Sequence, residues 1–145
     1  MGKEPKMEKM KSTRPFSKSQ EDFLEALLML EEKGEPLETT KVAHILGVSK
    51  PAVHQMGHEL IDRGLITRID YGDMALTDAG REVAVRTLKR HRLLKRFFLL
   101  LGVSEETAEK DCCEVEHALS DETIAQIEFF VASHASAGEA MEKNG

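Results

Sequence analysis

Apolar residues recur at intervals of three, four and seven along most of the chain, which is the spacing of amphipathic helices. In the first such stretch the apolar positions are Phe23, Leu24, Leu27, Leu28 and Leu30. Ser19, followed three residues later by Asp22, is expected to cap the start of this helix. Gly34 and Pro36 predict its end.

Caps and breakers predict the remaining elements. Further helices are expected at about 39–46, 50–63, 78–101, 105–118 and 121–133. Pro51 suits the first turn of the helix that begins near residue 50, because its missing N–H has no helical partner there. Residues 65–69 and 74–76 read as short strands around the turn Tyr71-Gly72-Asp73, so a β-hairpin should follow the third helix.

Residues 39–58 match the twenty-residue pattern of a helix-turn-helix unit. Ala43 stands at the fifth position, where the helices cross closely, and Gly47 stands at the ninth, where the turn needs a positive φ. The positions expected to point inward are Val42, Leu46, Val48, Val53 and Met56. An ordinary helical hairpin would often satisfy the apolar positions, but it would not usually place alanine and glycine correctly and precede a β-hairpin. The pattern therefore predicts a winged helix-turn-helix that binds double-stranded DNA.

In this geometry the start of the second helix enters the major groove. The residues expected to reach DNA are Ser49, Lys50, Pro51, Ala52, His54 and Gln55, with His58 also facing outward. Gln55 can make a bidentate contact to adenine, and Pro51 or Ala52 can touch a thymine methyl group. Lys50, Arg68 and the lysines near the N-terminus are candidates for phosphate contacts.

Charge and pattern together predict four segments in a mainly α chain. They are a flexible basic arm (1–17), the winged helix-turn-helix (18–77), an all-helical domain (78–133) and a flexible tail (134–145). Residues 1–15 carry five Lys or Arg and two Glu, whereas residues 104–145 carry two Lys and 11 acids. The acidic segment could attract cations or could simply be a solvated helical face.

Composition excludes several classes of protein. Apolar residues make up 41% of the chain, too many for a disordered one, and no apolar run approaches the length of a membrane span. The N-terminal residues lack the apolar core of a secretory signal, so a cytoplasmic protein with no membrane partner is expected. Cys112 and Cys113 are neighbours that should point apart on a helix, which favours a thiolate role or burial over a disulfide.

Potential metal ligands cluster outside the DNA-binding unit. Glu109, Cys113, Glu116 and His117 follow at intervals of four, three and one, which places them on one helical stripe. Cys113, Glu116 and His117 offer sulfur, oxygen and nitrogen donors within one turn, as a transition-metal site requires. Cys112 should point about 100° away from this stripe.

Three residues elsewhere could complete the shell. They are His91 on the preceding helix and the pair Asp22 and Glu25 on the first helix. Each also has an ordinary interpretation, since Asp22 and Glu25 could be surface carboxylates and His91 lies in the basic stretch KRHRLLKR. The sequence predicts a metal site centred on Cys113-x-x-Glu-His.

The combination resembles the diphtheria toxin repressor family of metal-dependent transcriptional repressors. The resemblance covers about residues 19–133 and is carried by three segments. They are LEEKGEPLETTKVAHILGVSKPAVHQMGHELIDRGLI, LTDAGREVAVRTLKRHRLLKRFFLLLGV and CCEVEHALSDE. The chain ends before the point where longer members add an SH3-like domain, so the two-domain, manganese-type architecture is expected.

The resemblance implies a repressor of metal homeostasis genes that binds a palindromic operator as a homodimer, with Mn(II) or Fe(II) as corepressor. It implies the metal ligands Asp22, Glu25, His91, Cys113, Glu116 and His117. Asp22 fits manganese-type members, whereas Cys113 stands where those members have Glu and iron-type members have Cys. Lys95 and Glu109 replace two ligands of the iron-type ancillary site, which is therefore not expected.

The implied mechanism involves no catalysis. The ion would join the first helix to the helices of the second domain, and the apolar residues Leu119, Ile124, Ile127, Phe129 and Phe130 would form the dimer seam. One alternative is a winged-helix regulator that senses an organic ligand or a redox signal through Cys113. A second alternative, a small metalloenzyme, lacks an evident general base, phosphate loop or activated nucleophile.

Overall fold

The computed structural model describes residues 16–68 and 72–144, with side chains as far as residue 134. The chain divides into two compact units, an N-terminal unit of residues 18–89 and a C-terminal unit that begins at Arg90. The boundary lies inside one long helix, whereas the sequence suggested a division after residue 77. Most of the predicted basic arm, residues 1–15, lies outside the described residues.

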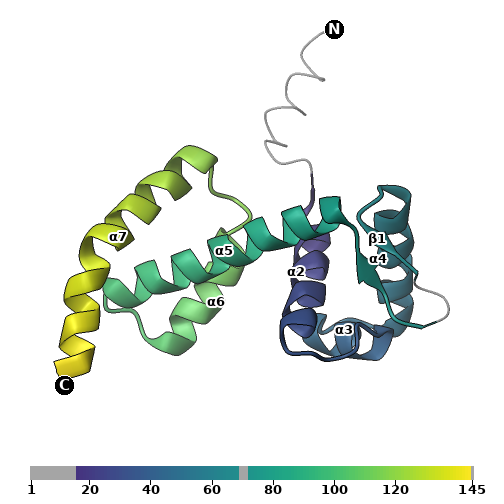
Figure 1. The fold of residues 1–145 in the computed structure, drawn as a ribbon, viewed down its shortest axis with the longest axis horizontal. Helices are drawn as coiled ribbons and strands as arrows, with labels where there is room; N and C mark the ends of the chain where they lie inside the picture. Colours follow the sequence, from purple (N-terminus) through teal and green to yellow (C-terminus); the bar gives the residue numbers. More distant parts are fainter. Residues whose placement is uncertain (1–15, 69–71, 145) are drawn as a thin grey trace, which may run out of the picture. The chain divides into compact units, whose positions relative to one another are not determined.

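The N-terminal unit is a three-helix cluster with a short β-hairpin. It comprises α2 (Lys18–Glu32), α3 (Thr39–Leu46), α4 (Lys50–Asp62), β1 (Ile66–Thr67) and β2 (Ala75–Leu76). The strands pair antiparallel, with Ile66 opposite Leu76 and Thr67 opposite Ala75. Figure 1 shows α3 leading into α4 and the hairpin following α4. The predicted winged helix-turn-helix is confirmed.

Apolar side chains from α2, α3, α4 and β1 form much of the core of this unit. The fully buried large side chains include Phe23, Leu24, Leu27, Val42, Val53, Leu60 and Ile66. Gly47 ends α3 in the left-handed region with φ of 67°, and the Ser49 hydroxyl accepts a hydrogen bond of 3.2 Å from the Ala52 N–H at the start of α4. Gly47 thus has the positive φ that the helix-turn-helix pattern predicted, and Ser49 caps the start of α4.

Two details of this unit differ from prediction. Ser19 lies inside α2, which begins one residue earlier at Lys18, so Ser19 does not cap the helix. Val48 was expected to point inward but is 44% exposed, because it follows the left-handed residue Gly47 and turns out of the core. Tyr71, at the predicted hairpin turn, and Ile69, at the end of the first predicted strand, lie outside the described residues.

The long helix α5 (Asp78–Leu100) begins against the hairpin. The Thr77 hydroxyl accepts a hydrogen bond from the Gly80 N–H at 3.0 Å and donates one to the Gly64 carbonyl at 2.7 Å. A Cβ atom on Gly80 would lie 1.9 Å from the carbonyl oxygen of Leu65, so only glycine allows this close approach. Thr77 therefore caps α5, which begins at Asp78, the residue where the sequence predicted this helix to start.

The C-terminal unit contains the second half of α5, α6 (Glu105–Val115) and α7 (Asp121–Asn144). Figure 1 shows α6 and α7 beside that half of α5. The helix predicted to reach residue 118 stops at Val115, so Glu116 is its C-cap and His117 lies in the following turn. The predicted flexible tail is helical as far as Asn144, in keeping with its content of Ala, Glu, Met and Lys.

The core of the C-terminal unit is small. Its buried apolar side chains in the described residues include Leu94, Ala108, Cys112 and Val131. Several large apolar side chains are exposed instead, including Leu101 at 59% and Phe129 at 72%. Among the described residues, no helix has the length and apolar character needed to cross a membrane.

Candidate metal centre and candidate nucleic-acid interface

The start of α4 presents the predicted DNA-reading side chains. Ser49, Lys50, Pro51, Ala52 and Gln55 are all exposed, whereas His54 is half-buried. Val53, between them, is buried and anchors the helix to the core. The structure therefore leaves a largely exposed face at the start of α4 that would enter the major groove in a helix-turn-helix complex.

His91 lies at the centre of a cluster of donor atoms in the C-terminal unit. Its Nδ1 lies 2.8 Å from Oε2 of Glu116, and its Nε2 lies 2.8 Å from Oε2 of Glu109. The side chain of His91 is only 16% exposed, which is incompatible with the alternative of a solvated histidine in a basic stretch.

Both cysteines belong to this cluster. Cys113 Sγ lies 3.8 Å from Nδ1 of His91 and 3.5 Å from Oε2 of Glu109. Cys112 Sγ lies 3.5 Å from the same Nδ1 and donates to the Glu109 carbonyl oxygen at 3.3 Å. The prediction that Cys112 points away from the site is wrong, because the His91 ring, which belongs to α5, lies close to the sulfur atoms of both Cys112 and Cys113. Neither cysteine forms a disulfide in the structure.

Burial keeps the two thiols protonated when no ion is bound. Burial, followed by the negative charges of Glu109 and Glu116, raises the pKa of Cys112 to about 12. Burial and a hydrogen bond to Glu109 raise the pKa of Cys113 as well. A metal ion that binds these sulfurs must therefore displace their protons.

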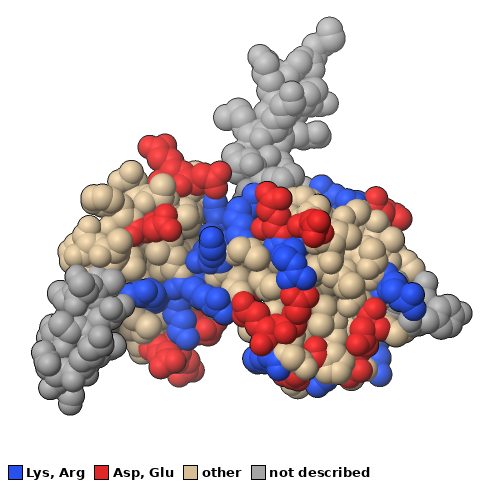
Figure 2. Space-filling view, in the orientation of Figure 1, with Lys and Arg blue, Asp and Glu red and all other residues tan. Residues whose placement is uncertain are grey.

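Lys95 places a positive charge beside Glu109, the most exposed member of the His91 cluster. Its Nζ lies 3.2 Å from Glu109 and 3.6 Å from Glu105. Burial acts to raise the pKa of Glu109, but the hydrogen bond from Lys95 and the charge of His91 outweigh it and lower that pKa. On this unit, Figure 2 shows Lys and Arg side chains along α5 and acidic side chains at the start of α6.

Glu116 and His117 lie side by side at the end of α6. Glu116 is 1% exposed, the side chain of His117 is 7% exposed, and their Oε1 and Nε2 atoms are 3.1 Å apart. The structure thus brings four of the predicted ligands, His91, Cys113, Glu116 and His117, into one region of the C-terminal unit. Asp22 and Glu25 belong to the N-terminal unit, where α2 holds them one turn apart.

A buried arginine that sequence reasoning missed fixes the turn after α6. The Arg90 guanidinium is 5% exposed and donates to the carbonyl oxygens of Glu116 at 3.2 Å and Leu119 at 2.7 Å. It also pairs with Asp121. These carbonyl groups bond to Arg90 rather than to a further turn of helix, which explains why α6 ends at Val115. The position of Arg90 one residue before His91 was the only signal in the sequence.

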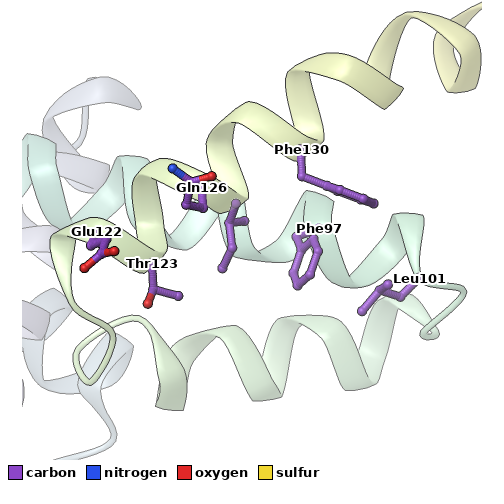
Figure 3. Close-up of a pocket in the computed structure, with 7 residues that line it drawn as sticks. Phe97, Leu101, Glu122, Thr123, Gln126 and Phe130 are labelled. Atoms are coloured by element: carbon purple, nitrogen blue, oxygen red, sulfur yellow. The ribbon is translucent and has the colours of Figure 1, made fainter.

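An apolar groove of about 540 Å³ lies between α5 and α7. It is lined by Phe97, Leu101, Glu122, Thr123, Gln126, Ile127 and Phe130. Figure 3 shows Phe97 on α5, Leu101 just after the end of α5 and Phe130 on α7 around this groove. Phe97 and Phe130 meet edge to face with their ring centroids 5.7 Å apart. Two of the residues predicted for the dimer seam, Ile127 and Phe130, therefore line one open apolar surface.

Comparison with known proteins gives matches to both units. Residues 15–73 match the family described as "Iron dependent repressor, N-terminal DNA binding domain". Residues 77–136 match the one described as "Iron dependent repressor, metal binding and dimerisation domain".

Individual relatives are similar over most of the chain. An uncharacterized HTH-type transcriptional regulator of Methanocaldococcus jannaschii is 36% identical over 80% of this chain and 94% of its own length. The transcriptional regulator MntR of Escherichia coli O157:H7 is 35% identical over 79% of this chain and 74% of its own. A solved manganese-dependent transcriptional repressor in complex with manganese has a TM-score of 0.72 and 30% identity over 78% of this chain. This chain spans 52% of the length of that repressor.

Proposed function

The chain belongs to the iron-dependent repressor family, and from this premise we propose that it is a metal-dependent transcriptional repressor of metal homeostasis genes with Mn(II) or Fe(II) as corepressor. One observation carries the proposal: the donor atoms of His91, Cys113 and Glu116 gather in a unit separate from the exposed DNA-reading face of α4. In such a protein, metal binding by one unit can be coupled to DNA binding by the other.

We assign the corepressor to Asp22, Glu25, His91, Cys113, Glu116 and His117. The support for His91, Cys113, Glu116 and His117 is their proximity and their burial in the C-terminal unit. The support for Asp22 and Glu25 is their spacing on α2 and the family pattern. Carboxylate and imidazole donors suit Mn(II) and Fe(II), and the sulfur of Cys113 moves the preference toward Fe(II).

The proposed mechanism couples the two units through charge. When bound, the ion supplies positive charge that carboxylates from both units share. Without that charge Asp22, Glu25 and Glu116 would repel one another in the DNA-binding arrangement. Metal binding would therefore favour that arrangement by as much as the metal affinity of these ligands differs between the two states. No step of this mechanism transforms a substrate.

We propose a homodimer on a palindromic operator as the DNA-bound form. Two copies related by a two-fold axis present two α4 helices, so their target should repeat in inverted orientation one helical turn apart or a multiple of it. Such a regulator acts where the DNA is, which for this chain would be the cytoplasm.

Titration of a palindromic promoter fragment tests the proposal. Operator binding should need Mn(II) or Fe(II), should be abolished by a chelator, and should weaken steeply with added salt as phosphate-bound counterions are released. Equal affinity with and without chelator would contradict the corepressor role. His117→Ala should remove the metal response, whereas His44→Ala, an exposed histidine on α3, should keep it.

A further inference from the structure

Four donor residues of the C-terminal unit form a cluster that the corepressor assignment explains only in part, since Glu109 and Cys112 are not among its ligands. One ligand atom from each of His91, Glu109, Cys112 and Cys113 lies within 4.8 Å of the others. All four come from α5 and α6 and belong to one compact unit. Cys112 is fully buried, and Glu109 forms the 45% exposed edge.

The donor set is that of a tetrahedral site for a thiophilic ion. Two thiolates, an imidazole and a carboxylate suit Zn(II) or Co(II) better than Mn(II), which prefers oxygen ligands. Zn–S bonds of about 2.3 Å and Zn–N bonds of about 2.0 Å place the donors of a tetrahedron about 3.5–3.8 Å apart. Cys112 Sγ lies 3.8 Å from His91 Nε2, the ring nitrogen that faces Glu109, and Cys113 Sγ lies 3.5 Å from Oε2 of Glu109.

The surroundings of His91 also suit a metal ligand. A metal-bound histidine usually donates its second ring N–H to a carboxylate, which fixes the tautomer. Each ring nitrogen of His91 has a carboxylate oxygen at 2.8 Å, from Glu116 on one side and Glu109 on the other. Glu116 can therefore orient the ring while the remaining nitrogen binds an ion beside Glu109 and the sulfurs.

We propose that His91, Glu109, Cys112 and Cys113 form a second metal site, selective for Zn(II) or Co(II) and built from the C-terminal unit alone. Binding replaces the two thiol protons with two metal–sulfur bonds, releases two protons and changes no oxidation state. The site needs neither Asp22 nor Glu25. Since it shares His91 and Cys113 with the proposed corepressor ligands, an ion held here withholds both residues from that set.

Anaerobic titration of the reduced full-length chain with Co(II) tests the proposal. We expect a near-ultraviolet thiolate-to-cobalt charge-transfer band and the visible bands of tetrahedral Co(II), both removed by added Zn(II). The Asp22→Ala, Glu25→Ala double variant should keep these bands. Cys112→Ser should weaken Co(II) binding about tenfold or more and reduce the charge-transfer intensity, since ligands affect affinity at least as strongly as their hydrogen-bonding partners.

Two further variants separate loss of a ligand from loss of folding. Cys112 is fully buried, so the helical circular dichroism of Cys112→Ser must match that of the parent chain. Glu109→Gln changes a partly exposed residue and should weaken Co(II) binding, whereas Glu114→Gln, exposed on the same helix, should not. Unchanged binding in both Cys112→Ser and Glu109→Gln, or loss of the bands in the Asp22, Glu25 double variant, would overturn the proposal.

The test is independent of the repressor function. A chain that binds Co(II) through these four residues but shows no metal-dependent operator binding would contradict the proposed function and support this site. A chain whose operator binding responds to Mn(II), but whose Co(II) complex lacks the sulfur band, would contradict this site and leave the proposed function standing.

Discussion

Arg90 is the residue that holds the predicted metal-binding turn in place. Its guanidinium donates to the carbonyl oxygens of Glu116 and Leu119 and pairs with Asp121, while its side chain is 5% exposed. It offers no atom to a metal, since a guanidinium has no lone pair to donate. It acts through the backbone of Glu116, and so its effect on metal binding is one of positioning.

Arg90→Ala should therefore lower both stability and metal affinity. Hydrogen bonds from a charged group contribute about 2 kcal/mol each when buried, and the variant leaves two carbonyl oxygens without this donor. A lower urea midpoint together with weaker Mn(II) binding is expected from unfolding curves and calorimetry. Lys89→Ala, an exposed neighbour on α5, is the matched control. Native Mn(II) affinity in Arg90→Ala would show that Arg90 does not position the site.

The two cysteines show how far residue-level reasoning from sequence reaches. The structure places His91 of α5 beside Cys113 and Glu116, two of the residues that the spacing Cys113-x-x-Glu-His had grouped. It missed Cys112, because a helical wheel considers the direction of a side chain on its own helix and ignores the reach of a ring from a neighbouring one. The His91 imidazole belongs to α5 and lies close to both sulfur atoms of α6. This contact depends on how the two helices pack.

At the scale of elements, α4 carries the prediction for sequence-specific DNA binding. Gln55 is exposed near the start of α4, as are Ser49 and Lys50. If it reads adenine, Gln55→Ala should reduce discrimination between operators by about 1–3 kcal/mol per half-site while metal affinity stays unchanged. Binding curves on matched and base-substituted operators measure this. A uniform loss of affinity on all sequences would instead make Gln55 a phosphate contact.

Helix starts were predicted better than helix ends. Ser49, Thr77 and Ser104 each accept a capping hydrogen bond at the predicted helix start, because an N-cap depends on residues close in sequence. The early end of α6 depends on Arg90, 26 residues from Glu116 in the chain. Helix α7 continues beyond the predicted end at residue 133 to Asn144, because the small polar residues of the tail permit a helix.

The junction of the hairpin with α5 gives a second prediction at this scale. Gly80→Ala should destabilise the N-terminal unit by about 2 kcal/mol or more, since its Cβ would lie 1.9 Å from the Leu65 carbonyl oxygen and the backbone must move. Ala79→Gly, in the same helical turn but exposed, should cost no more than about 1 kcal/mol. Urea unfolding of both variants measures the difference. Equal stability would mean that the hairpin shifts without strain.

At the scale of the whole molecule, the exposed apolar surface of the C-terminal unit requires explanation. The unit buries few large side chains, while Leu101 and Phe129 are exposed and an open groove lies between α5 and α7. Exposed apolar patches of this kind usually mark a protein interface. The match to a metal binding and dimerisation domain covers the same residues. A second copy of the chain is the partner that fits both observations.

Phe129→Glu should therefore convert the proposed dimer to a monomer. Phe129 is 72% exposed, so the change removes little from the core of one chain but would place a charge in an apolar seam. Sedimentation should show a monomer with unchanged helical circular dichroism. Operator affinity should fall sharply, because two half-sites then no longer bind as one unit. Glu128→Gln, exposed beside it, should remain dimeric. A dimeric Phe129→Glu chain with full operator affinity would show that Phe129 lies outside the dimer seam.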